Sequence, residues 1–364
     1  MAAKRAVPLM VAASIALGGC ANIGYYLQSV QGQLEVLHRE RPIDEVMAAP
    51  ETPEALRQKL AAVLKIRAFA SEALGLPDNA SYRRYADLDR PFAVYNVFAT
   101  PELALKPLEW CFPFAGCVKY RGYFSRVEAE RFAAELVSRG HDVFIGGVPA
   151  YSTLGWFADP VLNTFVSYPQ PELARLIFHE LAHQVVYVRD DTMFNESFAV
   201  TVQREGVRRW LASHGSDRDR ELYQRVESRR RQFVEVVQTY RGKLEALYES
   251  DLPVAEKRAR KAALFAELDN AYDALRAAWG IVGGHDRWLG QRPNNALLAS
   301  VSIYTHLVPA FQALLRAKNG NLPAFYAEVK ALAALPAPER SAQLAAIGAH
   351  AAARDDAPEA PVER

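Results

Sequence analysis

The chain has 364 residues, and 43 lysines and arginines are balanced by 42 aspartates and glutamates, which gives a formal net charge of +1. This near neutrality, and the lack of a stripe of basic residues interleaved with aromatic ones, argue against a nucleic-acid partner. The composition is average, and the length allows one large domain with elaborations or two domains.

The first residues indicate a targeting signal. Two basic residues precede an apolar run, Ala6 to Leu17, which is too short to span a bilayer and leads into the tetrapeptide LGGC ending at Cys20. This pattern predicts a lipoprotein signal peptide over residues 1–19, with a plain secretory peptide or an anchor helix as the alternative. By resemblance to bacterial lipoproteins, cleavage before Cys20 would leave several acyl chains on that cysteine and anchor the protein stably. Ala21, in place of the Asp that retains lipoproteins at the inner membrane, favours the periplasmic face of the outer membrane.

Residues 20–90 predict an N-terminal helical region. Apolar residues recur three or four positions apart in two stretches, the second between Pro53 and Ala70. The first set comprises Leu27, Val30, Leu34 and Leu37. We expect both apolar faces to pack against the rest of the protein, and we expect no membrane-spanning segment after residue 20.

From residue 91 the chain is rich in β-branched and aromatic residues, typical of strands. PFAVYNVFAT from Pro91, HDVFIGGV at 141–148 and LNTFVSY at 162–168 each predict a strand. Arg126 to Gly140 predicts a helix that ends at a glycine. These elements form a small α+β unit within a catalytic core that we place at residues 91–215.

Two cysteines remain if Cys20 carries lipid. Cys111 and Cys117 are separated by FPFAG, and the predicted compartment permits oxidation. We expect a disulfide that closes a small loop. A metal site is the weaker alternative, because two cysteines without a neighbouring histidine supply only half of the ligands that such a site needs.

Residues Pro171 to Val188, PELARLIFHELAHQVVYV, contain the pattern His-Glu-x-x-His. On a helix His179 and His183 project from one face about one turn apart, close enough to bind one tetrahedral metal ion. Glu180 lies about 100° further round the helix and can accept a proton from water in the open position of that metal. The alternative is a plain buried helix.

A third ligand decides the class of site. The long metzincin motif would place a histidine at position 189, which is Arg189, so that class is excluded. Glu196 is the candidate, because its helix face is mostly apolar and a buried carboxylate is costly unless it pairs with a cation. The same face carries Ala199, Val200, Gln203, Val207 and Trp210. A solvated Glu196 is the alternative; Asp190 and Asp191 suit helix capping, and Glu205 points about 180° away.

Residues 216–353 predict a helical region that completes the active-site cleft, and residues 354–364 a disordered tail. Asp217 to Trp279 predicts a helical hairpin with a break at residues 250–253. Pro293 to Lys318 predicts a further helix that is kinked at Pro309.

That last helix offers two donors for the oxyanion of a hydrolytic reaction. Tyr304 and His306 are two residues apart and point about 200° from each other, so only one can face the metal. We choose Tyr304, because a phenol remains a neutral donor over the working pH range. A core tyrosine bonded to a backbone carbonyl is the alternative.

HELAHQ followed by FNESFA resembles the gluzincin arrangement of zinc peptidases, His-Glu-x-x-His with a downstream glutamate. More narrowly, the chain resembles a family of bacterial lipoproteins described as aminopeptidases. Further matching stretches are YYLQSVQGQLEVL at 25–37, GCVKYRGYF at 116–124, AYSTLGWFADP at 150–160 and NNALLASVSIYTHLVPAF at 294–311. The resemblance covers nearly the whole mature chain and implies a zincin-like fold with one Zn²⁺ ion.

The resemblance also bears on substrate binding. In zincins a strand shortly before the motif helix forms the edge of the cleft, so Tyr151 to Phe157 or Leu162 to Tyr168 is the expected ledge for the substrate backbone. Only twelve residues separate His183 from Glu196, fewer than in thermolysin-like enzymes. The substrate pockets of those enzymes therefore do not transfer in detail.

These observations predict an α+β, predominantly helical, zincin-like peptidase. Zinc on His179, His183 and Glu196 would activate water, Glu180 would carry the proton to the leaving amine, and Tyr304 would stabilise the oxyanion. Aminopeptidase action follows from the resemblance alone, and an endopeptidase is equally compatible with these residues. A non-catalytic envelope binding or assembly factor, with a structural or absent zinc, is the alternative of another class. The oligomeric state stays open.

Overall fold

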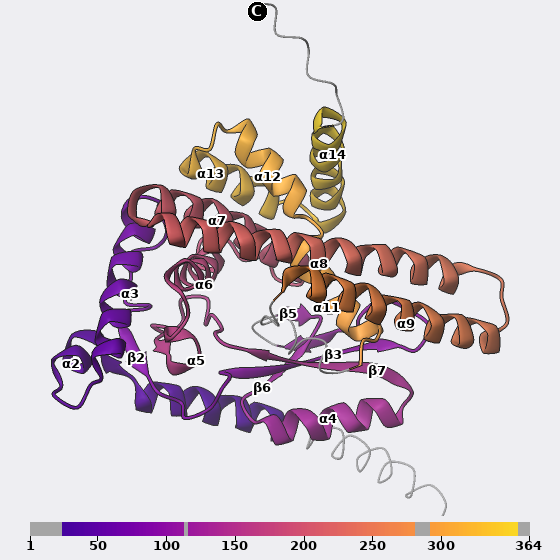
Figure 1. Ribbon diagram of the computed structural model, residues 1–364, viewed down its shortest axis with the longest axis horizontal. Helices are drawn as coiled ribbons and strands as arrows, with labels where there is room; N and C mark the ends of the chain where they lie inside the picture. Colours follow the sequence, from indigo (N-terminus) through magenta and orange to yellow (C-terminus); the bar gives the residue numbers. More distant parts are fainter. Residues whose placement is uncertain (1–23, 113–115, 281–291, 356–364) are drawn as a thin grey trace, which may run out of the picture.

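The computed structural model describes residues 24–112, 116–280 and 292–355. The predicted signal peptide and the lipid attachment at Cys20 lie outside these residues. So does most of the predicted disordered tail, although the last helix continues to Asp355, two residues into it. The described chain is α+β and mostly helical (Figure 1).

The described strands form two small sheets and a hairpin. The sheet orders are β1-β2-β8 and β6-β3-β7, and β4 pairs with β5. The strands are β1 (Arg41–Pro42), β2 (Arg84–Ala86), β3 (Val94–Pro101), β4 (Trp110–Phe112), β5 (Gly116–Val118), β6 (Arg121–Tyr123), β7 (His141–Val148) and β8 (Val161–Leu162).

The helices account for most of the remaining chain. The first, the N-terminal helix, covers residues 24–39. The others are α2 (Ile43–Ala48), α3 (Glu54–Glu72), α4 (Arg126–Ser138), α5 (Asn163–Val166), α6 (Gln170–His183), α7 (Thr192–His214), α8 (Asp217–Glu249), α9 (Val254–Trp279), α11 (Asn295–Thr305), α12 (Val308–Ala317), α13 (Leu322–Ala333) and α14 (Ala337–Asp355).

Strand β3 is buried on both faces, which explains its mostly apolar sequence. It pairs with β7 from Val94↔Val148 to Pro101↔His141, and the antiparallel β6 borders its other edge. Because side chains alternate along a strand, Tyr95 and Val97 pack with residues of α4, whereas Phe98 packs with residues of α11. The sheet is thus held between α4, from the predicted core at residues 91–215, and α11, from the C-terminal region.

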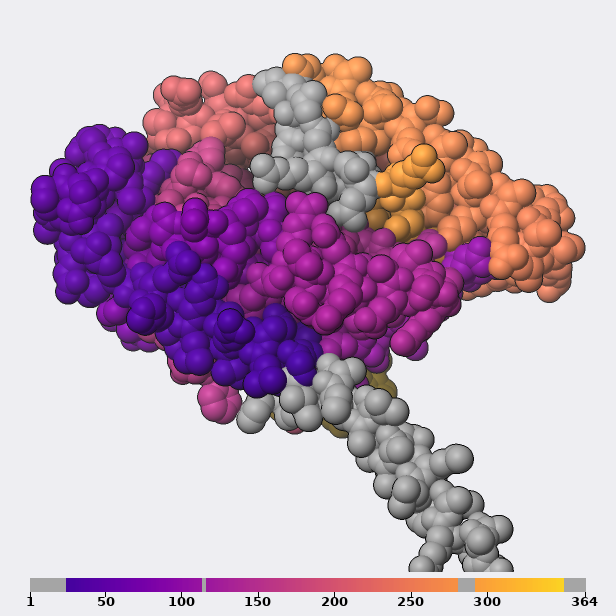
Figure 2. Space-filling view, turned by 90° about the horizontal axis from the view of Figure 1, so that it is seen from below, coloured from indigo at the N-terminus to yellow at the C-terminus, as the bar shows by residue number. Residues whose placement is uncertain are grey.

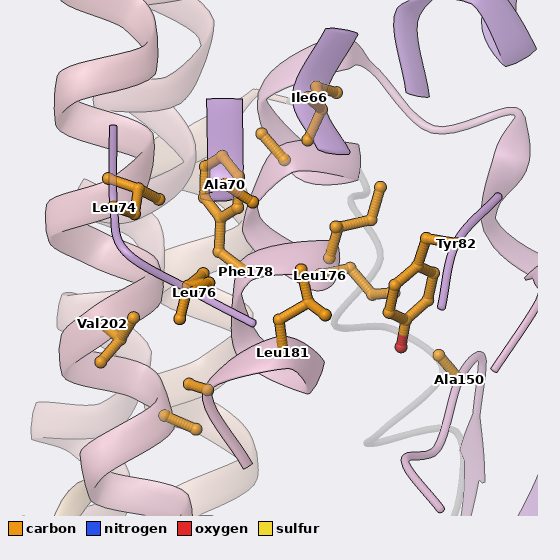
Figure 3. Close-up of a cluster of buried hydrophobic side chains, with 14 of the residues drawn as sticks. Ile66, Ala70, Leu74, Leu76, Tyr82, Ala150, Leu176, Phe178, Leu181 and Val202 are labelled. Carbon is orange, nitrogen blue, oxygen red and sulfur yellow. The ribbon is translucent and has the colours of Figure 1, made fainter. Parts of the chain in front are cut away.

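Helices α6 and α7 pack side by side, and the main core surrounds them (Figure 3). Phe178 and Leu181 from α6 lie in the same cluster as Val202 from α7 and Ile66 from α3. A Cβ atom at Gly206 would lie 2.7 Å from the Phe178 ring. The lack of a side chain there lets the two helices approach closely.

The N-terminal helix corrects one prediction. Leu27, Val30 and Leu34 are 64 %, 58 % and 58 % exposed, so this apolar stripe does not pack against the protein. The inner face carries Gly32 and Val36 instead, and the Phe124 ring occupies the space where a Cβ of Gly32 would lie, at 2.1 Å. Aliphatic periodicity identifies a stripe, but it does not show which side of a helix meets the body.

The predicted strand at residues 162–168 is also wrong. Only Val161 and Leu162 are extended, and α5 follows at once. The first residue of this helix, Asn163, is tied to the segment before β3, since its side chain accepts a hydrogen bond from the Leu88 backbone N–H at 2.9 Å and donates one to the Arg90 carbonyl at 3.3 Å. Residues 151–157 contain no strand either, so neither predicted substrate ledge exists as a strand.

The C-terminal region begins with the predicted hairpin, α8 and α9 (Figure 1). The expected kink at Pro309 is a complete break, because proline offers no N–H to the Thr305 carbonyl four residues earlier and α11 ends at Thr305. The stretch Asn295–Ala317 is long and apolar enough to cross a membrane by length and composition, contrary to our expectation. However, 61 % of its most apolar window is buried inside the protein, where α11 contacts β3 and α7.

Candidate metal centre

Helices α6 and α7 bring three metal-ligating side chains together. His179 and His183 lie in the last turns of α6, and Glu196 is the fifth residue of α7. The His183 Nε2 atom lies 3.3 Å from His179 Nε2, and Glu196 Oε2 lies 3.2 Å and 3.8 Å from His179 Nε2 and His183 Nε2. All three ligand atoms therefore converge on one point between the helices.

The separations of these atoms fit a tetrahedral ion. Zinc bonds of about 2.0–2.2 Å at tetrahedral angles place neighbouring ligand atoms about 3.3–3.6 Å apart. Glu196 Oε2 is buried and has no hydrogen-bond partner among the described residues, which is costly for a carboxylate oxygen. A divalent cation would satisfy this oxygen and both imidazole lone pairs, so the residues present can hold a metal ion.

Hydrogen bonds behind His179 fix the tautomer of its ring. The His179 Nδ1 atom lies 3.0 Å from Gln203 Oε1, and the Arg175 guanidinium donates to the same oxygen at 3.4 Å. Arginine has only donors, so the atom of Gln203 that faces both groups is the carbonyl oxygen. His179 Nδ1 must then carry the proton, which leaves Nε2 free to bind a metal.

Burial sets the protonation of the other ligands. It lowers the pKa of His183 to about 4, which makes this imidazole neutral at pH 7. For Glu196, burial alone would raise the pKa, but His183 and His179 lower it below the usual range of a glutamate. For His179, burial alone would lower the pKa, but Glu196 and Glu180 raise it above the usual range of a histidine. A metal binds only neutral imidazole, so a cation at this centre would displace any proton on His179 Nε2 and be held by two neutral imidazoles and one carboxylate.

Glu180 lies beside the ligands and is 9 % exposed. Burial raises its pKa to about 7, because the charged form loses water; Glu196 and Asp159 also raise it, whereas His179 opposes the shift. A carboxylate with this pKa can accept a proton and release it again near neutral pH, as a general base requires.

Two tyrosines approach the carboxylates from the sheet side. Burial and then the charge of Glu196 raise the pKa of both Tyr304 and Tyr120, and Glu180 contributes to each. Tyr304 comes from α11, and Tyr120 precedes β6 and contacts the Phe98 ring at 5.5 Å. His306 is exposed. Of the two candidates, Tyr304 on α11 is therefore the one near the centre, and His306 follows the end of that helix.

The competing carboxylates are occupied elsewhere. Asp191 caps α7 and pairs with Arg340 at 2.8 Å, and Glu205 pairs with Arg208 and Arg209 on its own helix. Asp190 accepts a hydrogen bond from the backbone of Cys117. Cys117 forms a disulfide with Cys111, so the β4-β5 hairpin is fastened beside the loop between the metal helices.

Tyr120 and Gln203 lie near the candidate ligands, although neither was predicted as a site residue. Tyr120 lies in the stretch GCVKYRGYF, but nothing in its spacing indicates the metal centre 60 residues later. The sequence position of Gln203 does indicate a place near the centre, because Gln203 follows Glu196 by seven residues on the same helix face. An amide two turns after a predicted ligand is a candidate for the second layer of a metal site.

Comparison with known proteins gives a family but no neighbour of established function. No curated protein matches the chain. No solved structure matches it either. A family model described as "Putative aminopeptidase" matches residues 24–344, which include every residue of the candidate centre. The chain belongs to this family.

Proposed function

We propose that the chain is a zinc-dependent peptidase with a zincin-like, gluzincin-type centre. One observation carries the proposal: two imidazoles converge with a buried carboxylate, whose Oε2 has no hydrogen-bond partner among the described residues, beside a second carboxylate whose pKa lies near 7. A purely structural metal site has no use for a general base next to an open coordination position. The family description supports hydrolysis of peptide bonds.

Each residue has a distinct task in this proposal. Zinc held by the two histidines and Glu196 would supply a Lewis acid and lower the pKa of a water molecule to near neutrality. Glu180 takes the proton from that water and passes it to the leaving amine, which its pKa of about 7 permits. Tyr304 and Tyr120 are neutral donors on the opposite side, placed to stabilise negative charge on the carbonyl oxygen.

The proposal extends to location and substrate. We infer that Cys20 carries lipid and holds the enzyme on the periplasmic face of the outer membrane, since LGGC ends an apolar run preceded by basic residues. The family description favours removal of N-terminal residues over internal cleavage. Peptides with free and acetylated N-termini separate these two activities.

Two matched substitutions test the centre. Glu180→Gln should keep stoichiometric zinc and lose turnover, because it removes the base but no ligand. Glu196→Gln should lose zinc affinity by orders of magnitude while the fold survives. Glu205→Gln, nine residues further along the same helix and paired with arginines, should keep both metal and turnover.

Bound metal and hydrolysis of a peptide library are measured for each variant. If Glu196→Gln holds zinc as tightly as the parent, the ligand set is wrong. If the parent binds one zinc ion but cleaves no peptide in the library, the protein is a binding or assembly factor instead.

A further inference from the structure

The N-terminal helix presents an apolar face to solvent. Tyr26, Leu27, Val30 and Leu34 are 40 %, 64 %, 58 % and 58 % exposed. At 100° per residue all four lie within an arc of about 100°, and they cover about 12 Å of the helix axis. No residue from Gly24 to Leu34 is charged. We call these four side chains the apolar stripe.

The stripe is not a consequence of loose packing. On the inner side Gly32 lies against the Phe124 ring, Tyr25 stacks on Phe112 with ring centroids 5.3 Å apart, and the Arg121 guanidinium lies 4.1 Å from the Tyr25 ring centroid. The Gln33 side chain accepts a hydrogen bond from the Tyr151 hydroxyl at 2.6 Å. These contacts fix the rotation of the helix, so the stripe must face outward.

The size of the stripe argues against a second protein as its binding partner. Its four side chains expose on the order of 400 Å², about half of the roughly 800 Å² that each partner buries in a standard protein interface. An uncharged, one-helix-wide face with a tyrosine at one end suits instead the boundary between lipid headgroups and acyl chains. Figure 2 shows the earliest described residues, in indigo, at the surface of one face of the molecule.

The position of the stripe in the sequence favours a lipid bilayer as its binding partner. Cys20 precedes Tyr26 by six residues, and six extended residues span at most about 22 Å. Acyl chains on Cys20 would therefore hold the stripe within reach of the same bilayer. We propose that the N-terminal helix lies flat on the membrane through Tyr26, Leu27, Val30 and Leu34, and fixes which face of the enzyme meets the bilayer. This inference rests on the proposed lipid attachment.

Cysteine accessibility in the full-length protein tests the contact. Val30→Cys should react at least tenfold more slowly with a water-soluble maleimide in isolated membranes than after detergent extraction. Val254→Cys is the matched control, because Val254 is 52 % exposed at the turn of the α8–α9 hairpin. It should react equally fast in both states.

The possible outcomes separate the two proposals. Equal reactivity of Val30→Cys in membranes and detergent, with the protein in the membrane fraction, would overturn the helix contact and leave the lipid anchor intact. A protein found only in the soluble fraction would overturn both. Efficient cross-linking of Val30→Cys to itself by a short bis-maleimide would assign the stripe to a second copy of the chain.

Vesicle binding supplies a second measurement. The chain from residue 21 to 364 contains every described residue and lacks the lipid. It should bind phosphatidylcholine vesicles as well as vesicles containing phosphatidylglycerol, because the stripe is uncharged. The triple variant Leu27→Gln, Val30→Gln, Leu34→Gln should bind at least tenfold more weakly, and Val254→Gln should bind like the parent. Unchanged binding of the triple variant would refute the proposal.

Discussion

Gln203 is a sensitive test of how the centre is built. Its side chain is 6 % exposed, and its oxygen is the acceptor that faces His179 Nδ1 at 3.0 Å. Gln203→Leu keeps the size of the side chain but leaves a buried N–H without an acceptor, which costs about 1–3 kcal/mol. Since about 1.4 kcal/mol is a factor of ten, zinc affinity should fall about 5- to 150-fold, in the range of second-layer substitutions at other zinc sites.

The dissociation constant for zinc is measured by competition with a chelator of known affinity. Gln203→Glu restores an acceptor and should recover the affinity. Gln184→Leu is the matched control: it removes the same amide one residue after His183, but Gln184 bonds to Asn79 and Ser81 and not to a ligand. Equal zinc affinity for Gln203→Leu and Gln184→Leu would refute the proposed function of Gln203 and with it the assigned tautomer of His179.

Three further predictions concern the site, an ion pair and the helix packing. Tyr304→Phe should lower kcat about 100-fold with little change in KM, and Tyr326→Phe, which loses a buried hydroxyl bonded to a carbonyl away from the metal, should leave kcat unchanged. Burial alone would raise the pKa of Glu172, but two arginines lower it to about 2, so this group stabilises the fold above pH 4.5 and the stabilisation is lost as the pH falls toward 2. Denaturant titrations should therefore show Glu172→Gln less stable than the parent by about 2–3 kcal/mol at pH 7, with a difference that shrinks toward pH 3; a constant difference would contradict this. Gly32→Ala should lower the free energy of unfolding by about 1–3 kcal/mol through overlap with the Phe124 ring, whereas Gly242→Ala, which meets nothing within 4 Å, should not.

The metal residues could be predicted because helix geometry places them locally. His179, Glu180 and His183 share two turns of one helix, so their relative positions follow from the helix repeat alone. Predicting Glu196 as a ligand required one more argument, the free-energy cost of a lone carboxylate on an apolar helix face. That face of α7 is buried, as expected. The strand His141–Val148 and the helical hairpin also follow from local periodicity.

What could not be predicted depends on contacts between distant segments. Tyr120 lies near Glu196 because β6 pairs with β3, and α11 contacts both β3 and the helix α7 that carries Glu196. The direction of the N-terminal stripe depends on Gly32 and the Phe124 ring, which belong to elements far apart in the sequence. Periodicity predicts that a helix has an apolar face, but only the tertiary structure decides whether that face meets protein or solvent.

The short connection between the metal helices explains how two separate elements form one rigid centre. The Asn195 side chain accepts a hydrogen bond from the Val188 backbone N–H at 2.7 Å and donates one to the Val188 carbonyl at 2.8 Å, while Asp191 caps α7 and pairs with Arg340. These bonds hold the residue next to Glu196 against the segment that follows α6, and so help to fix the position of Glu196 relative to the two histidines.

The same connection also fastens the disulfide hairpin, because Asp190 accepts a hydrogen bond from the Cys117 backbone N–H. Tyr120, just before β6, and Tyr304, on α11, come from other elements, and after burial the charges of Glu196 and Glu180 raise the pKa of both phenols. Under the proposed peptidase function, we therefore expect substitutions beside Tyr120 and Tyr304 to alter substrate preference more than substitutions of the exposed residues in the connecting loop.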